Sequence, residues 1–135
     1  MLGRKIEQKR AMTGRRFVAV VVSLMVVAAS LPAQSAGDAA RGAAVYESLC
    51  AGCHALDENR VGPAHRGVFG RKAGSAPDYD YSEALASSKV VWSEETLDRW
   101  LSGPEKFIPG QKMSISVASE ADRRDVIAYL KAQSR

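Results

Sequence analysis

The stretch that decides the fold is Cys50-Ala51-Gly52-Cys53-His54, a C-x-x-C-H motif that contains both cysteines of the chain. Two cysteines three residues apart at the end of a helix present both sulfur atoms on one face, where they can add to the two vinyl groups of one haem. The imidazole of the next residue, His54, then lies under the iron and can bind it. We therefore predict one haem c, attached covalently through Cys50 and Cys53, with His54 as an iron ligand.

Three other interpretations of the motif are weaker. A disulfide across a two-residue spacer is strained and reducible, and it leaves His54 without a role. A zinc site needs four ligands, and the adjacent Cys53 and His54 are badly placed to share one tetrahedron, even if Cys50 and His65 complete the set. A thiol–disulfide oxidoreductase has its two cysteines at the start of a helix that follows a strand, whereas these cysteines end a helix. Covalent haem attachment accounts best for the motif.

A second axial ligand is expected among the remaining methionines and histidines. Three of the four methionines precede residue 35, which leaves Met113, in a polar loop 59 residues beyond His54. A lone methionine usually fills a gap in the core, but a polar loop is a poor place for that role. The alternative is His65, the other histidine, which would have to reach the opposite haem face on a tether of 11 residues. With His54 and Met113 bound, substrates are kept from the iron, which favours electron transfer over catalysis.

The first 35 residues have the order of a secretory signal peptide. A basic stretch ends at Arg15-Arg16, an apolar run extends from Phe17 to Leu31, and Pro32 is followed by small residues. The apolar run has about 15 residues, fewer than the roughly 20 that span a bilayer. We expect residues 1–35 to be cleaved; the alternative is an uncleaved anchor in the inner membrane. In both cases residues 36–135 form one domain in the periplasm.

The basic character of the chain is confined to this leader. Residues 1–35 hold six of the 19 Lys and Arg residues but one of the 15 Asp and Glu residues. The remaining 100 residues therefore contain 13 basic and 14 acidic residues, a formal net charge of −1. Such a domain is not expected to bind nucleic acid, and long-range attraction to its partner proteins should be weak.

Three segments of the domain show helical periodicity. The first covers residues 38–49, the second covers residues 94–102 and ends at Gly103-Pro104, and the third follows a capping-box sequence at residues 119–122. A shorter turn can begin at Ser82.

The stretches between these helices, residues 55–80 and 103–118, are rich in Gly, Pro and charge and show no β-alternation. We therefore predict an all-α fold with three to five helices and long loops. A domain of this size with modest helices makes a small core by itself. A large, flat, apolar cofactor would give the loops a surface to pack on.

Further motifs occur in a fixed order along the chain: Gly42, Tyr46, Cys50-x-x-Cys53-His54, Val61-Gly62-Pro63, Gly67-Val68-Phe69-Gly70-Arg71-Lys72, Tyr79-x-Tyr81, Trp92, Pro109-Gly110-x-Lys112-Met113 and Ile127-Ala128-Tyr129-Leu130. In these motifs residues 37–133 resemble class I c-type cytochromes, in particular the branch of mitochondrial cytochrome c and bacterial cytochrome c2. The resemblance implies a small cytochrome c fold, with residues 36–135 wrapped around the haem. It also implies that the first and last helices cross at Gly42, Tyr46 and Tyr129.

The same resemblance implies roles for four further residues of the site. The carbonyl of Pro63 would accept the Nδ1 hydrogen of His54 and so fix the imidazole. Arg71, Tyr81 and Trp92 would bind the buried haem propionates.

Three positions near Met113 depart from the family pattern: Trp100 stands in place of a tyrosine, Leu85 in place of an asparagine and Gln111 in place of a threonine. We therefore expect an altered polar network around the methionine sulfur.

The resemblance also implies a function, that of a monomeric one-electron carrier without enzyme activity. Its donor would be a cytochrome bc1-type complex, and its acceptor a terminal oxidase, a photosynthetic reaction centre or a peroxidase. The alternative is a haem-based peroxidase or gas sensor with a labile sixth ligand. The two differ in their response to carbon monoxide, which a carrier with two firm axial ligands does not bind.

Overall fold

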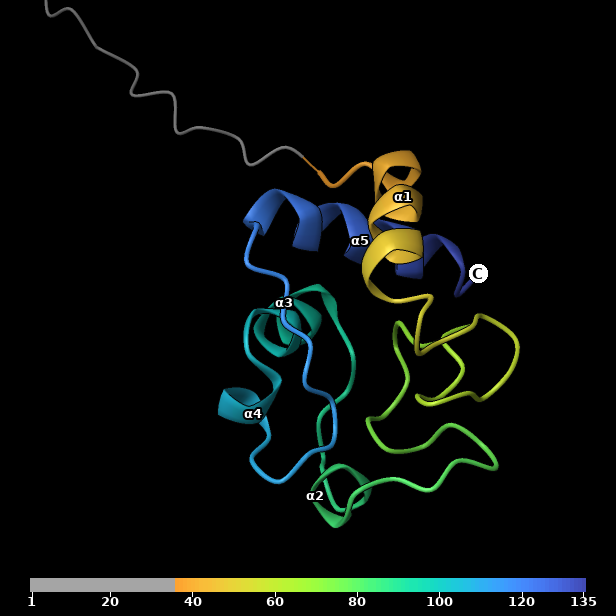
Figure 1. The fold of residues 1–135 in the computed structure, drawn as a ribbon, viewed down its shortest axis with the longest axis vertical. Helices are drawn as coiled ribbons and strands as arrows, with labels where there is room; N and C mark the ends of the chain where they lie inside the picture. The colour runs from red at the N-terminus through yellow and green to blue at the C-terminus, as the bar shows by residue number, and fades with distance from the viewer. Residues whose placement is uncertain (1–35) are drawn as a thin grey trace, which may run out of the picture. The chain divides into compact units, whose positions relative to one another are not determined.

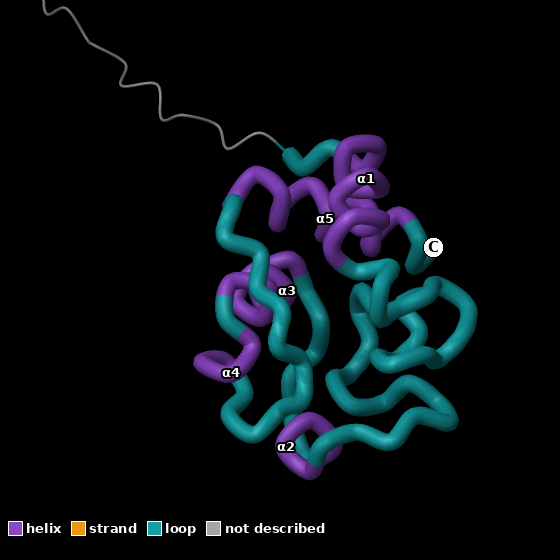
Figure 2. Tube along the Cα trace, viewed as in Figure 1, coloured by secondary structure: helices purple, strands orange, loops and turns teal. Residues whose placement is uncertain are grey.

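The computed structural model describes residues 36–135; the signal peptide predicted over residues 1–35 lies outside this range. Five α-helices joined by long loops build the described part: α1 (Ala39–Leu49), α2 (Glu83–Ala86), α3 (Glu94–Ser102), α4 (Pro104–Phe107) and α5 (Glu120–Ala132) (Figure 1). Within these 100 residues there is no strand (Figure 2). One isolated antiparallel bridge joins Lys72 to Val91. The predicted all-α fold is confirmed. None of the helices described is long and apolar enough to cross a membrane.

The three longer helices each begin at a polar residue that caps the first turn. The Asp38 carboxylate accepts hydrogen bonds from two N–H groups at the start of α1. Ser93 and Thr96 form a complete capping box at α3. The Ser119 hydroxyl accepts a hydrogen bond from the Asp122 N–H at α5. Because capping is a local interaction, the sequence predicted these three helix starts to within one residue.

The segment after α3 differs from the prediction. A loop was expected over the whole of residues 103–118, and this is wrong for its first turn, because α4 begins at Pro104 directly after α3. Proline ends a helix when it lies in the interior, but its fixed φ and missing N–H suit the first position of a new one. The turn expected at Ser82 is present as α2, with the Ser82 side chain as its cap.

The first and last helices, α1 and α5, pack across each other (Figure 1). At Gly42 of α1 an added Cβ atom would lie 2.0 Å from the carbonyl oxygen of Asp125 and 2.9 Å from the Cβ atom of Tyr129. The rings of Tyr46 and Tyr129 lie beside this contact with their centroids 5.2 Å apart. The crossing thus uses the glycine and the two tyrosines that the family resemblance implies.

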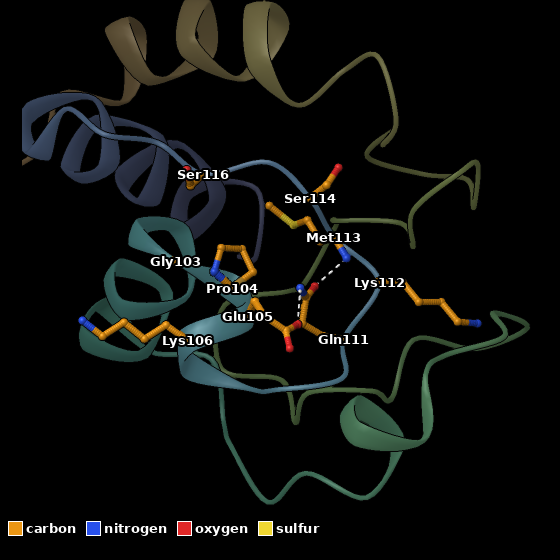
Figure 3. A pocket seen from close by; sticks show the side chains of 9 residues that line it. All are labelled: Gly103, Pro104, Glu105, Lys106, Gln111, Lys112, Met113, Ser114 and Ser116. Carbon is orange, nitrogen blue, oxygen red and sulfur yellow. Dashed lines mark hydrogen bonds between the residues drawn. The ribbon is translucent and has the colours of Figure 1, made fainter.

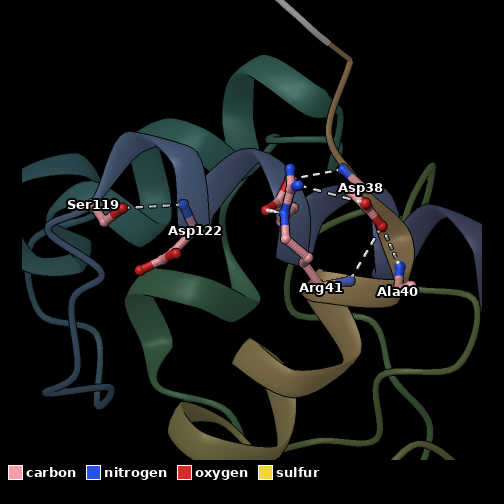
Figure 4. A network of polar contacts seen from close by, with 6 residues as sticks. Asp38, Ala40, Arg41, Ser119 and Asp122 are labelled. Carbon is pink, nitrogen blue, oxygen red and sulfur yellow. Dashed lines mark hydrogen bonds and ion pairs between the residues drawn. The ribbon is translucent and has the colours of Figure 1, made fainter.

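A buried carboxylate adds a polar tie between the same two helices. Asp125 of α5 is 5% exposed. It accepts hydrogen bonds from the N–H of Asp38 at 2.7 Å and from Nε of Arg41 at 2.8 Å, and the Asp38 and Arg41 side chains are seen at the start of α1 in Figure 4. The hydrogen bond from Arg41, followed by that from the Asp38 N–H, lowers the pKa of the Asp125 carboxyl. A buried charge with such partners holds the start of α1 against α5.

The apolar core draws side chains from α1, α3, α5 and the loops. It contains Tyr46, Val68, Ala73, Trp92, Leu97, Trp100, Leu101, Ile108, Val117, Val126, Ile127 and Leu130. Eight of these residues also line a cavity: Val68, Trp92, Leu97, Trp100, Leu101, Val117, Val126 and Leu130. The core therefore surrounds a cavity instead of closing on itself.

Candidate haem-binding site

A cavity of about 370 Å³, lined mainly by apolar side chains, lies between the helices and the loops. All eight site residues predicted from the sequence line it: Cys50, Cys53, His54, Pro63, Arg71, Tyr81, Trp92 and Met113. The fold thus gathers at one cavity a set of residues that is scattered from the end of α1 to the loop before α5.

The two cysteines and His54 lie on one tight turn at the end of α1. The N–H groups of Cys53 and His54 both donate to the carbonyl of Cys50, at 3.0 and 2.9 Å. Both thiols are free, with Cys53 exposed and Cys50 half-buried. Burial raises the pKa of the Cys50 thiol to about 11. The turn presents two thiols and an imidazole to the same cavity, as attachment of one haem requires.

The backbone of residues 62 and 63 holds the His54 imidazole. Its Nδ1 atom lies 2.9 Å from the carbonyl oxygen of Pro63. Because a carbonyl can only accept, Nδ1 carries the hydrogen and Nε2 keeps a free lone pair for a metal. An added Cβ at Gly62 would lie 2.1 Å from the Cε1 atom of His54, so a glycine is needed here. Burial lowers the pKa of His54, although the bond to Pro63 opposes this, and the ring is therefore neutral at neutral pH.

His65 lies beside His54. The two rings are stacked with their centroids 3.9 Å apart and their planes at 18°. Burial, followed by the nearby His54 and Arg71, lowers the pKa of His65 to about 3. This placement speaks against His65 as the second axial ligand, because a ligand of that kind would have to lie across the cavity from His54.

Met113 lies on a loop that is held by a chain of hydrogen bonds. Its N–H donates to Oε1 of Gln111, and Nε2 of Gln111 donates to Glu105 of α4 at 3.3 Å. Figure 3 shows these two hydrogen bonds. Glu105 also accepts from the N–H of Gly110 at 3.0 Å. Met113 borders both this cavity and an outer hollow of about 510 Å³ that α4 and the same loop line. The part played by Glu105 is absent from the sequence prediction, which treated α4 as loop.

Arg71 brings a polar atom without a partner to the wall of the apolar cavity. Its two terminal nitrogens donate to the carbonyls of Ala64, at 2.9 Å, and Arg66, at 3.1 Å. Its Nε is buried and has no hydrogen-bond partner among the described residues. The hydroxyl of Tyr81, on the same cavity, accepts from the N–H of Ala76 at 3.1 Å. A buried donor of this kind is costly unless an acceptor joins it, and the carboxylate of a haem propionate would serve.

The three departures from the family pattern lie around the same space. Trp100 is 8% exposed and tilts against Trp92, with ring centroids 5.4 Å apart. Leu85 and Gln111 line the cavity with Trp100. The cavity wall near Met113 is consequently more apolar than a tyrosine and an asparagine would make it.

The residues present fit haem c. Two thiols and an imidazole whose Nδ1 is already occupied stand at one end of a mainly apolar cavity. A thioether borders the same cavity, and an unpartnered guanidinium nitrogen belongs to another of its lining residues. Thiols, imidazole and thioether are the groups that attach and ligate this cofactor.

Comparison with known proteins gives the same assignment. The family model described as Cytochrome c matches residues 39–134. Cytochrome c of Euglena viridis is 42% identical over 98 residues, which cover 70% of this chain and 96% of that protein. Cytochrome c of Theileria annulata is 44% identical over 102 residues, covering 73% of this chain and 88% of that protein. Among solved structures, cytochrome cH from Methylobacterium extorquens has a TM-score of 0.68 and 41% identity, over 71% of this chain and 99% of that one.

These matches extend over all five helices and over the cavity between them. Proteins of this family are electron-transfer proteins, not enzymes, and they bind haem c covalently through the motif that Cys50, Cys53 and His54 provide here. The predicted cofactor and the predicted absence of enzyme activity are confirmed by the family assignment. By the match of its sequence, its fold and its attachment motif, the chain belongs to the cytochrome c family.

Proposed function

We propose that this member of the cytochrome c family is a monomeric, periplasmic one-electron carrier whose iron is bound by His54 and Met113. The proposal is carried by one observation: an imidazole with its Nδ1 occupied and the one thioether of the domain line the same apolar cavity. The bound haem supplies the one-electron couple of its iron. Cys50 and Cys53 hold it covalently, and the apolar wall excludes water.

The remaining site residues position the group and neutralise its charge. Pro63 holds the hydrogen on Nδ1 of His54 and so keeps Nε2 directed at the iron. Arg71, Tyr81 and Trp92 bind the propionates, and the unpartnered Nε of Arg71 supports this assignment.

Redox partners dock where the cavity reaches the surface. Leu49, Val61 and Ile115 line the cavity and are also 45%, 75% and 46% exposed, so they form an apolar rim around its opening. Partner contact at this rim brings the two redox groups close without opening the site. The electron donor is a cytochrome bc1-type complex, and the acceptor is a terminal oxidase or a photosynthetic reaction centre. Since the domain is near neutral, its association rates depend only weakly on salt.

The leader supports the periplasmic location. Its basic stretch and its apolar run of about 15 residues are typical of a signal peptide, and haem c is attached outside the cytoplasm. The alternative, an uncleaved anchor, would leave the same domain on the outer face of the inner membrane.

The test is expression and export in a host that matures c-type haem. We expect a red protein whose mass equals residues 36–135 plus one haem, with pigment that resists acidified organic solvent. When reduced, its spectrum should not change under carbon monoxide, and it should pass electrons from a bc1-type complex to an oxidase. Extractable pigment would contradict covalent attachment. Ready binding of carbon monoxide would contradict the carrier and favour a peroxidase or gas sensor.

A further inference from the structure

Four aromatic rings form a continuous row from α5 to the haem-binding site. The ring of Tyr129 lies against that of Tyr46, and Tyr46 meets the ring of His65 edge-on, with centroids 5.7 Å apart. His65 in turn stacks on His54 at 3.9 Å. The row therefore connects the crossing of α1 and α5 to the imidazole that we assign to the iron.

His65 is held in this row from several directions. Its Nδ1 atom lies 3.2 Å from the hydroxyl of Tyr46, a residue of α1 that is 5% exposed. Its backbone N–H donates to the carbonyl of Ala55 at 3.0 Å, and its own carbonyl accepts from the N–H of Val68 at 2.9 Å. A ring anchored both by its backbone and by its side chain can hold a neighbouring ring in place.

Two contacts already hold the His54 ring. The carbonyl of Pro63 holds Nδ1 at one edge, and Gly62 lies against a face, where an added Cβ would be 2.1 Å from Cε1 and 2.5 Å from both ring nitrogens. A hydrogen bond at one edge and a glycine without a side chain still allow the ring plane to tilt. The stacked His65 covers a face of this ring with its own plane only 18° away, so a tilt of His54 would drive the two rings into each other.

We propose that His65, held in place by the Tyr46 hydroxyl, is a positioning residue that sets the plane of the His54 imidazole. The proposal rests on the proposed function, in which His54 binds the iron. The direction of an axial imidazole plane decides which iron orbitals it overlaps, and so how the unpaired electron of the oxidised protein spreads over the haem. His65 would thereby act on electron transfer without touching the iron.

The experiment uses the oxidised holoprotein and the NMR shifts of its four haem methyl groups, whose order and spread report the imidazole plane. The first variant, His65→Leu, replaces the imidazole with an apolar side chain of similar size. The second, Tyr46→Phe, removes only the hydroxyl, and the third combines both substitutions. Tyr129→Phe is the matched control, because it removes a hydroxyl from the same row at a ring that does not contact His65.

We expect His65→Leu to change the order or spread of the methyl shifts and Tyr46→Phe to change them in the same sense by a smaller amount. In the His65→Leu background, Tyr46→Phe should cause no further change, because the hydroxyl then has nothing to hold. Tyr129→Phe should leave the wild-type pattern.

A wild-type methyl pattern in both single variants, with only the melting temperature altered, would overturn the proposal and leave His65 as core packing. An equal effect of Tyr46→Phe with and without His65 would also overturn it. Failure of the proposed function would be recognised separately, because the unmodified protein would then lack the upfield methionine signals of a bound thioether.

Discussion

The α-carbon of Gly42 approaches the backbone of Asp125 so closely that a Cβ atom added to it would lie 2.0 Å from the carbonyl oxygen. The obstacle is main chain, which cannot move aside as the end of a flexible side chain can. The crossing of α1 and α5 therefore depends on a residue without a side chain. Cys50 and Cys53 follow the end of α1, so this contact also positions the haem-attachment turn.

Replacing Gly42 with alanine should destabilise the holoprotein. In an isolated helix this change would be favourable by about 1 kcal/mol, because alanine is the better helix former. Here the overlap with Asp125 must separate the helices, and overpacking of this kind costs roughly 1–3 kcal/mol. Guanidinium unfolding measures the net loss. Gly103→Ala is the control, since a Cβ atom there meets only the Cβ atom of Lys106, at an ordinary contact distance of 3.6 Å. Equal stability of Gly42→Ala and the wild type would show that the crossing is looser than described.

Asp125 should make the stability of the protein depend on pH in the acid range. Its folded-state pKa is lowered by Arg41 and by the Asp38 N–H, so the unfolded chain holds the proton more tightly. The stabilisation is then present above the unfolded-state pKa of about 3.9 and is lost as the pH falls through the lower, folded-state pKa.

Asp125→Asn should lower the free energy of unfolding at neutral pH and flatten its decline in acid, as measured by denaturation at a series of pH values. Asp57→Asn is the comparison, because Arg66 also lowers the pKa of Asp57 but the two side chains are 51% and 70% exposed. Solvent screens such a pair, and its removal should matter less. A pH profile unchanged by Asp125→Asn would disprove the assignment.

Met113→Ala should open the second axial position. The variant should lose the far-red absorption band of an iron–sulfur bond in the oxidised protein, show a lower reduction potential and bind carbon monoxide or imidazole. The potential falls because a thioether favours the reduced iron. Persistence of the far-red band in this variant would remove Met113 from the iron.

Gln111→Ala should weaken the hold on Met113 while leaving the methionine in place. Gln111 joins the N–H of Met113 to Glu105, so its loss removes the tie between Met113 and α4, while the hydrogen bond from the Gly110 N–H to Glu105 remains. We expect imidazole to displace the methionine at lower concentration, and Glu105→Ala to have a similar, non-additive effect. Lys106→Ala is the control, because Lys106 lines the same outer hollow (Figure 3). Equal imidazole affinity in Gln111→Ala and Lys106→Ala would count against the role of this chain of bonds.

Local signals account for what the sequence could predict of the fold. Asp38, Ser93 and Ser119 each act within a turn of their own position, so the starts of α1, α3 and α5 follow from nearby residues. Pro104 was misinterpreted because the same residue can end one helix or begin the next, and the choice depends on tertiary packing. Nothing in the sequence near Asp125 indicates that it is buried, because its hydrogen-bond partners, Asp38 and Arg41, lie at the other end of the domain.

The candidate site likewise contains residues that the sequence could predict and residues that it could not. The C-x-x-C-H motif gives the attachment residues because their spacing is itself the requirement. The position of His65 depends on how the loop after His54 folds back. The sequence gives only the separation of the two histidines along the chain. The link from Glu105 through Gln111 to Met113 joins a helix that was not predicted to a loop that was.

The pairing of α1 with α5 has a consequence for how the protein is made. The haem-attachment turn follows α1, whose main partner is α5, so α1 cannot dock until the chain through Ala132 has been made. Until then, Cys50 and Cys53 follow a segment that has not yet packed against α5, and their thiols are open to reaction with haem. The late pairing of α1 with α5 thereby leaves time for haem to be attached before the domain closes over it.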